Sequence, residues 1–450
     1  MGVSGWHNSE DFLNVTDDCP FIRAPWSGAG RTVFDEYKEI PSQAKLLVYL
    51  SFLPGLVVGF IYTDLSYFLT KVQGLSDFWM GATIFTMGGT LVAASFPLGI
   101  LADRYGKRTM LLLGNVLAGA SLIGFALTTN VVLVIIIAVL EGLGEAAFAV
   151  SFNALLADSA GDANRTTAFS LGAFLGWVSG AIGASSISSV LLIQRLGVSA
   201  AQAHTILYVI VGLLGLSVSP LVLRVHETKT ARRRNILPRD PRSVKTLTRY
   251  AIYSVALAFG AGLFVPLMTR WFSAAYNVSD AVSGPVLAAS SLLTAGAVLL
   301  VPRLARRLGL VKAVVVSQAF STVFMVAVPW SPTFAVAGTI YTVRVVLMNL
   351  SNPLGQSLLM GLVPREDRAA ASGITASLWR LPNSFSAIIG AALIGAGLLA
   401  LPFYIATVLY VFSISAFWFL FKDAKLPEEA TSPAQALTQS SSLDGSEEMR

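Results

Sequence analysis

The chain has 450 residues, of which 54% are hydrophobic and only 12% are charged. A soluble domain carries roughly 25% charged residues, so this composition excludes an ordinary water-soluble protein, whereas lipid suits the exterior of apolar helices. The formal net charge is +6, but the basic residues lie between hydrophobic runs, where they indicate membrane topology and no nucleic-acid binding.

A helix that crosses a membrane needs about 20 mostly apolar residues. The chain contains twelve such runs, and they predict an all-α membrane protein of twelve transmembrane helices. The predicted spans are 46–70, 78–101, 109–128, 131–157, 167–193, 203–223, 248–272, 281–302, 311–329, 333–361, 370–396 and 401–421.

The basic residues predict how these spans are oriented. With a cytoplasmic N-terminus, the outer loops would hold only Lys71, Arg195 and Arg270, and nearly all other basic residues would be cytoplasmic. Cytoplasmic loops of membrane proteins carry an excess of lysine and arginine. Both termini are therefore predicted to be cytoplasmic, in a multi-pass protein of the cytoplasmic (plasma) membrane.

The longest internal loop divides the spans into two groups of six. It carries Arg232, Arg233 and Arg234, among other basic residues, and such a strip could contact anionic membrane lipids. The tail is polar and is expected to be disordered. The expected parts are a cytoplasmic N-terminal segment 1–45, a six-helix bundle 46–223, a basic linker 224–247, a second six-helix bundle 248–423 and a cytoplasmic tail 424–450.

The second group of spans repeats the first at a constant offset of 203 residues. The matched pairs are Gly59 with Gly262, Asp77 with Asp280, Gly81 with Gly284, Arg104 with Arg307, and Gly106 with Gly309. Matches of Gly, Asp and Arg at one offset are far less frequent by chance than matches of Leu or Ala. Two parallel six-helix repeats are typical of one large class of transporters, whose substrate site lies between the halves near the membrane midplane.

A loop motif lies between the second and third predicted spans and reads Gly99-Ile-Leu-Ala-Asp103-Arg104-Tyr-Gly106-Lys-Arg108. It resembles the signature loop of the major facilitator superfamily, in the first cytoplasmic hairpin, where that family carries it. The second half holds a degenerate copy in which Arg306 replaces the aspartate. The glycines of 176–183 also resemble, weakly, a helix motif of the drug and metabolite:proton antiporter branch, with Ala181 in place of its proline.

This resemblance implies the two-bundle fold of secondary transporters and alternating access to a central site. It also implies that Asp103, Arg104 and Arg108 form a gate latch on the cytoplasmic side. Gly99 would allow close approach of a neighbouring helix, and Gly106 would allow the tight turn into the next helix. The alternative is that these charges only set topology.

Five ionisable residues fall inside predicted spans, where charge is costly and indicates a functional site. They are Asp64, Glu141, Glu145, Arg344 and Arg380. By resemblance to the family, all five lie on helices that line or flank the central cavity. The 203-residue offset places Glu141 and Arg344 at equivalent positions of the two halves, where they could form a structural ion pair. Polar residues on the predicted helix of Arg344 add Asn349 and Asn352 to the candidate substrate or proton-coupling residues.

These residues support two transport mechanisms. In the first, Asp64, Glu141 or Glu145 carries protons that drive export of a small amphipathic compound. In the second, Arg344 and Arg380 bind a small organic anion, because arginine can hold an anionic group with two hydrogen bonds. The remaining alternative is an internal salt-bridge network that only stabilises the bundle.

The sequence also bears on other classes of protein. No Walker-type phosphate loop or nucleophile–base motif is present, and Cys19 and the three histidines are scattered. We therefore expect a protein that is not an enzyme, has no metal site or cofactor, and works as a monomer. A non-transporting membrane sensor and a lipid translocase on the same scaffold remain alternatives to a secondary transporter.

Overall fold

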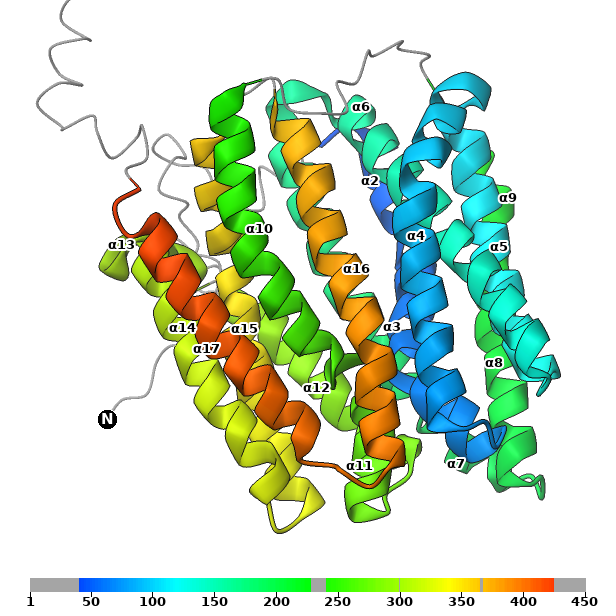
Figure 1. Cartoon of the computed structure of the whole chain (residues 1–450). Helices are drawn as coiled ribbons and strands as arrows, with labels where there is room; N and C mark the ends of the chain where they lie inside the picture. The colour runs from blue at the N-terminus through cyan, green and yellow to red at the C-terminus, as the bar shows by residue number, and fades with distance from the viewer. Residues whose placement is uncertain (1–39, 228–239, 299, 365–366, 425–450) are drawn as a thin grey trace, which may run out of the picture.

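The computed structural model describes residues 40–227, 240–298, 300–364 and 367–424, and every regular element among them is helical (Figure 1). The helices α2–α9 form one half, on the right of Figure 1, and α10–α17 form the other half, on the left. Most of the predicted N-terminal segment, linker and tail lies outside the described residues, so the predicted boundaries of those parts are untested.

The first half begins with the predicted first span, which is a chain of three helical elements. The predicted span 131–157 and most of the predicted span 167–193 belong to one long helix, α6. This helix bends back on itself, as the contact between Gly172 and Leu156 shows. The elements are α2 Ser42–Leu50, α3 Phe52–Tyr67, η2 Phe68–Val72, α4 Asp77–Tyr105, α5 Lys107–Leu127, α6 Val131–Ser186, α7 Ser189–Gln194, α8 Ala200–Ser217 and α9 Ser219–Val222.

The second half contains a discontinuity that the sequence analysis did not predict. The expected helix 248–272 is interrupted by the 3₁₀ turn η3, which contains Pro266, a residue without the backbone N–H that a continuous helix needs. The elements are α10 Pro241–Gly262, η3 Val265–Leu267, α11 Met268–Tyr276, α12 Asp280–Val298, α13 Val301–Leu308, α14 Leu310–Ala327, η4 Val328–Trp330, α15 Phe334–Leu362, α16 Arg368–Gly395 and α17 Leu401–Phe421.

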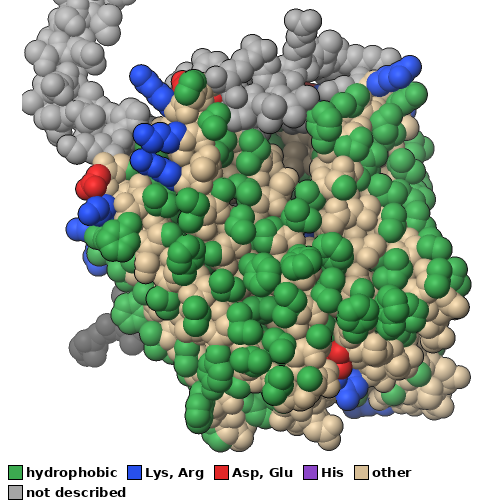
Figure 2. All heavy atoms as spheres, in the orientation of Figure 1, with side chains coloured by type: hydrophobic (Ala, Val, Ile, Leu, Met, Phe, Trp, Pro, Cys, Tyr) green, Lys and Arg blue, Asp and Glu red, His purple; other side chains and the backbone are tan. Residues whose placement is uncertain are grey.

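Among the described residues, eleven helical segments are long and apolar enough to cross a membrane. The remaining predicted span, 370–396, corresponds to α16, which is 28 residues long but carries Arg380, Asn383 and several serines. Figure 2 shows hydrophobic side chains spread over the visible face, with most Lys and Arg side chains at its upper edge. This distribution is expected for a bundle surrounded by lipid with basic loops at one end.

The repeat seen in the sequence reappears as equivalent packing in the two halves. A Cβ atom on Gly59 would lie 2.2 Å from the carbonyl oxygen of Gly180, and one on Gly262 would lie 1.9 Å from that of Asn383. Both contacts are related by the 203-residue offset, and both need a residue without a side chain. Close approach of small residues is the usual way in which membrane helices associate.

The halves meet through two equivalent helix pairs, α4 with α16 and α6 with α12. Gly81 on α4 faces the carbonyl oxygen of Ala387, while Gly284 on α12 faces that of Ala184. These four positions again differ by the same offset. They lie toward the end of the bundle that holds the turns after η2, α7, α11 and η4, at the bottom of Figure 1, which we call the predicted outer end.

Candidate functional site

Three side chains from the two halves form a bonded group, the central network, at the middle of the bundle. Arg380 on α16 donates through Nη2 to Oε1 of Glu145 on α6 at 2.7 Å. Its Nη1 donates to the hydroxyl of Tyr62 on α3 at 2.6 Å, and that hydroxyl donates to Oε2 of Glu145 at 2.8 Å. The guanidinium also lies over the Tyr62 ring, 5.5 Å from its centre. The network therefore joins the halves through a charged pair and a shared phenol.

The central network borders a cavity of about 160 Å³ between the halves. Arg380 is the charged residue of its lining, which also contains Tyr62, Asn383 and Ser384 among apolar side chains. The Arg380 side chain is 36% exposed and that of Glu145 is 14% exposed, so the pair is only partly withdrawn from water. An arginine carries five N–H donors, and the network uses two of them. The remaining donors are available to an acceptor group in the cavity.

Glu141 lies one turn before Glu145 on α6 but faces the interior of its own half. Its side chain is buried, and its Oε2 has no hydrogen-bond partner among the described residues. With Glu145 it lines a second, smaller cavity of about 40 Å³ that also includes Asn115. Glu145 therefore lines the second cavity and bonds to Tyr62 and Arg380, which line the first.

Arg344 lies at the equivalent position of the second half and likewise faces into its own half. Its Nη2 donates to the hydroxyl of Tyr410 at 2.7 Å, and its guanidinium lies 4.9 Å from the centre of the Phe264 ring. The residue is 3% exposed and is absent from the lining of the central cavity. Among the described ion pairs, none joins it to Glu141. The ion pair that the offset suggested is therefore absent among the described residues, and each of the two side chains contacts residues of its own half.

The two candidate asparagines of α15 bond to each other and to their own helix. Asn349 donates to the carbonyl oxygen of Val345 at 2.9 Å, and Asn352 donates to Oδ1 of Asn349 at 3.0 Å. Asn352 is exposed, and neither residue lines the central cavity. Their candidate role in substrate binding therefore remains a prediction.

The signature loop lies at the predicted cytoplasmic end. Gly106 has a φ of 104°, which permits the turn between α4 and α5. A Cβ atom on Gly99 would meet Val150 at an ordinary 3.6 Å, so no closer packing is required there in this conformation. The exposed Arg104 lies over the ring of Tyr105, while the side chain of Asp103 lies outside the described residues.

The other described contacts of this loop stay within the first half. Arg108 donates through Nη1 to the carbonyl oxygen of Leu223 at 3.1 Å. Glu227 accepts the backbone N–H groups of Lys107 at 2.7 Å and Arg108 at 3.1 Å, where it caps the first turn of α5. In this conformation these residues hold α5 to the chain after α9, and the predicted latch across the halves is untested.

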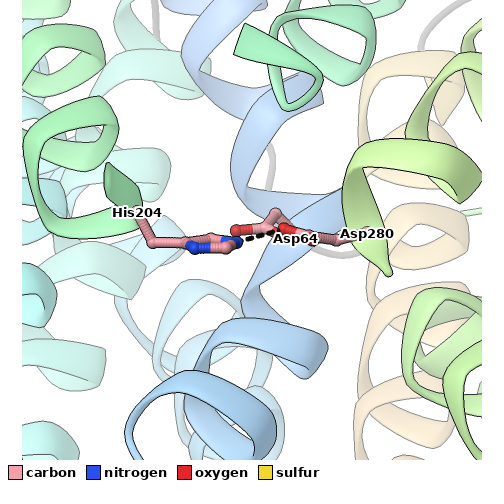
Figure 3. A group of neighbouring side chains, drawn as sticks. All are labelled: Asp64, His204 and Asp280. Carbon is pink, nitrogen blue, oxygen red and sulfur yellow. Dashed lines mark hydrogen bonds and ion pairs between the residues drawn. The ribbon is translucent and has the colours of Figure 1, made fainter. Parts of the chain in front are cut away.

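Asp64 belongs to a second buried group, the Asp64 cluster, which also contains His204 on α8 and Asp280 on α12 (Figure 3). One ligand atom of each residue lies within 4.8 Å of the others, and Nε2 of His204 lies 2.5 Å from Oδ2 of Asp280. All three residues are buried. The sequence analysis missed His204 and Asp280, although the pairing of Asp280 with Asp77 in the repeat was a usable signal.

Comparison with known proteins decides the family. The family model described as Major Facilitator Superfamily matches residues 47–386 and 250–445. The chain belongs to the major facilitator superfamily. An uncharacterized MFS-type transporter of Bacillus subtilis (strain 168), YqjV, is 30% identical over 124 residues. That match covers 26% of this chain and about 30% of the length of that relative.

Solved structures of this superfamily share the fold at low sequence identity. The nucleoside transporter NupG has a TM-score of 0.68 at 15% identity, over 85% of this chain and 99% of that one. A bacterial homologue of the human lysosomal transporter Spinster has a TM-score of 0.67 at 14% identity, over 90% and 100% of the two chains. These similarities establish the fold, and the predicted family membership is confirmed.

Proposed function

We propose that this major facilitator superfamily protein is a proton-coupled secondary transporter that exports a small amphipathic organic compound by alternating access. The central network, which joins Glu145 and Arg380 across the halves at the edge of a largely apolar cavity, is the observation that carries the proposal. The carboxylate would exchange protons, and the cavity wall would receive the apolar part of the solute.

The proposed topology has twelve spans with both termini in the cytoplasm of a plasma-membrane protein. Eleven described segments meet the requirements of a span, and α16 packs between α4 and α10 in the bundle as the twelfth would. The basic residues of the loops support this orientation. The end that carries Asp77 and Asp280 would then face the outside.

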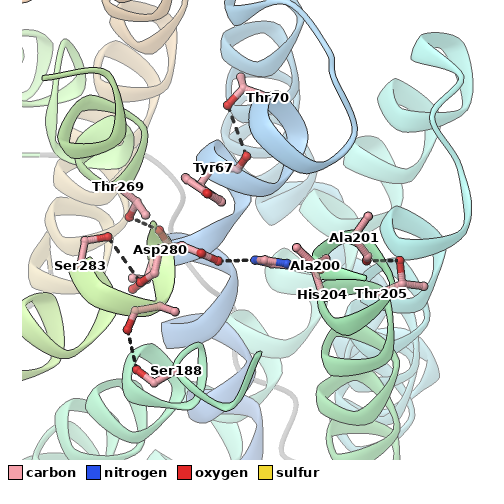
Figure 4. Close-up of polar contacts among 12 residues, drawn as sticks. Tyr67, Thr70, Ser188, Ala200, Ala201, His204, Thr205, Thr269, Asp280 and Ser283 are labelled. Carbon is pink, nitrogen blue, oxygen red and sulfur yellow. Dashed lines mark hydrogen bonds and ion pairs between the residues drawn. The ribbon is translucent and has the colours of Figure 1, made fainter. Parts of the chain in front are cut away.

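The contacts between the halves support an inward-facing conformation. At the predicted outer end, Arg270 bonds Asp77 at 2.7 Å. Ser188 donates there to the carbonyl oxygen of Ala281 at 2.7 Å, and Thr269 donates to the carbonyl oxygen of Thr63 (Figure 4). At the other end, the pair of Lys107 with Asp158 lies within one half. The outer side is thus closed by polar contacts across the halves.

The proposed coupling mechanism is a competition between a proton and Arg380 for the carboxylate of Glu145. While Glu145 is charged, it holds Arg380 and Tyr62 and keeps α6 close to α16. A proton on Glu145 would weaken the pair, because a neutral carboxyl group attracts a guanidinium far less than a carboxylate does. The halves could then separate at this level and the solute could exchange. Glu141, one turn away beside the second cavity, is the proposed relay for that proton.

Transport of a small organic anion is the second candidate function. Arg380 is favoured as its ligand, because it lines the cavity and has donors that the network leaves free, whereas Arg344 is enclosed by Tyr410 and Phe264. An anion would replace Glu145 at Arg380 once that carboxylate is protonated. Solute and proton would then move in the same direction.

Reconstituted protein in proteoliposomes distinguishes these two candidates. The internal pH is recorded while cationic, neutral and anionic amphiphiles are added in turn, with empty liposomes as the control. Proton movement triggered by cationic or neutral compounds supports the exporter, and movement triggered only by anions supports the second candidate. Absence of solute-dependent proton movement with every compound would reject proton coupling.

A further inference from the structure

The repeat places two aspartates at equivalent ends of α4 and α12, and each contacts the opposite half. Asp77 of the first half pairs with Arg270 of the second half at 2.7 Å. Asp280 of the second half meets His204 of the first half at 2.5 Å. The two bonds thus cross the interface at the outer end in opposite directions. They differ in their basic partner, since arginine stays charged at all physiological pH values and histidine does not.

The position equivalent to Arg270 in the first half explains this difference. At the 203-residue offset it is Tyr67, which offers no positive charge and instead stacks on His204 with ring centres 6.1 Å apart (Figure 4). His204 on α8 therefore occupies the place of a basic partner for Asp280. The Nδ1 atom of His204 lies 2.8 Å from the carbonyl oxygen of Ala200, which fixes the ring with Nε2 toward the carboxyl group.

Asp64 completes the cluster and lacks partners for its charge. Both of its carboxyl oxygens, one oxygen of Asp280 and the hydroxyl of Tyr208 are buried without a hydrogen-bond partner in the part of the chain that the structure describes. Asp64 and Asp280 are 0% and 1% exposed. Burying an unpaired carboxylate costs several kcal/mol or more, so these oxygens point to a missing positive charge.

Among the residues that the structure describes, the elements around the cluster supply no other cation. The titratable groups that face it are Tyr67 of α3 and Tyr208 of α8. Among the nearby basic residues, Lys71 of η2 and Arg195 after α7 are exposed, and Arg270 of α11 is bonded to Asp77. Ser188, before α7, contributes only a hydroxyl, which bonds to the backbone of α12. Protons or a bound cation must therefore neutralise the cluster.

The geometry favours protons over a metal ion. The ligand atoms of one tetrahedral zinc ion lie roughly 3.3 Å apart. The 2.5 Å between Nε2 of His204 and Oδ2 of Asp280 is too short for two ligand atoms of one zinc ion and is instead a hydrogen-bond contact, which needs a proton between the two atoms. With a neutral imidazole, the two carboxylates carry a net charge of −2. One bound proton makes this −1, and two bound protons make it zero.

We propose that Asp64, His204 and Asp280 form a proton-binding site whose occupation closes the outer side of the transporter. Closure brings Asp280 of one half against His204 and Asp64 of the other and removes all three from water, so the closed state favours the neutral, doubly protonated cluster. Opening separates the carboxyl groups and hydrates them, so protons leave to the outside. The proposal rests on the alternating access proposed above. It implies that external acid favours the state that is closed to the outside.

Spin labels on the two halves measure this closure directly. Leu196 and Trp330 are 81% and 75% exposed in predicted outer loops of the first and second half, and Cys19 is the only native cysteine. Both positions are changed to cysteine in a Cys19→Ser background, labelled, and measured by double electron–electron resonance in nanodiscs from about pH 5 to 8. Each proton bound on closing changes the closed-to-open ratio by up to about tenfold per pH unit, so two protons give up to about 100-fold.

The Asp280→Asn variant should lose one of the two protons, so its pH dependence should fall from up to about 100-fold to up to about tenfold per pH unit. The matched control is Asp77→Asn at the equivalent position, which should shift the distances toward the open state at every pH and keep the dependence of the wild type. Asp64→Asn, which removes the other carboxyl group and should lose the same part of the pH dependence, replaces Asp280→Asn if that variant does not reach the membrane. Wild-type pH dependence in the Asp280 or Asp64 variant would overturn the proposal. Closure by micromolar Zn²⁺ at constant pH would assign the cluster to a metal instead.

The proposed transport function is tested separately on the same labelled protein. Intact pH-dependent closure without any solute-dependent flux in proteoliposomes would reject transport and keep the proton site. Flux together with unchanged pH dependence in the Asp280→Asn variant would keep transport and reject the site.

Discussion

The charged pair of the central network should contribute measurably to the stability of this conformation. Removing one partner of a fully buried ion pair costs about 3–5 kcal/mol, whereas an exposed pair contributes about 0–1 kcal/mol. The side chains of Arg380 and Glu145 are 36% and 14% exposed, which lies between these limits. We therefore expect a coupling free energy of about 1–2 kcal/mol, a factor of roughly 5–30 in population.

A double-mutant cycle measures this coupling. Glu145→Gln, Arg380→Gln and the double variant are compared with the wild type by thermal unfolding in detergent. Each single variant leaves one charge without its partner, so the loss in the double variant should be smaller than the sum of the single losses. Arg380→Gln should be the more destabilising single variant, because the Glu145 carboxylate is the less exposed partner. Additive losses would refute the idea that this pair joins the halves.

Three further changes test other parts of the structure. Gly59→Ala places a Cβ atom 2.2 Å from a backbone carbonyl oxygen and should sharply lower the folded yield, while Gly296→Ala, with nothing within 4 Å, should not. Arg344→Met should lower the unfolding midpoint, because it leaves a buried tyrosine hydroxyl without its donor, and should leave anion binding measured by calorimetry intact. Asp103→Asn should reduce turnover in proteoliposomes with little change in apparent affinity, if the signature loop acts as a latch.

The sequence predicted the helices and the charged residues of the central site because both depend on local composition. Long apolar runs define spans, and Glu145 and Arg380 stand out within them as costly charges. Which way such a residue faces depends on packing. Glu141 and Arg344 are equivalent in the repeat, and each faces the interior of its own half, whereas Glu145, one turn further, reaches Arg380.

The residues that the sequence analysis missed lie at the ends of helices. His204 is in the first turns of α8 and Asp280 begins α12, where polar residues are ordinary. Only the tertiary contact between the halves brings them to Asp64. The break at η3 was missed for a related reason, since a single proline within an apolar run does not show whether a membrane helix bends or is interrupted.

In the proposed mechanism, Glu145 links proton movement to solute movement. The most direct test compares wild type and Glu145→Gln in proteoliposomes, with a transported solute identified by the panel described above. Solute exchange without gradients and proton movement driven by a solute gradient are recorded on the same preparation. We expect that Glu145→Gln keeps solute exchange and loses solute-driven proton movement. Wild-type proton movement in this variant would contradict it.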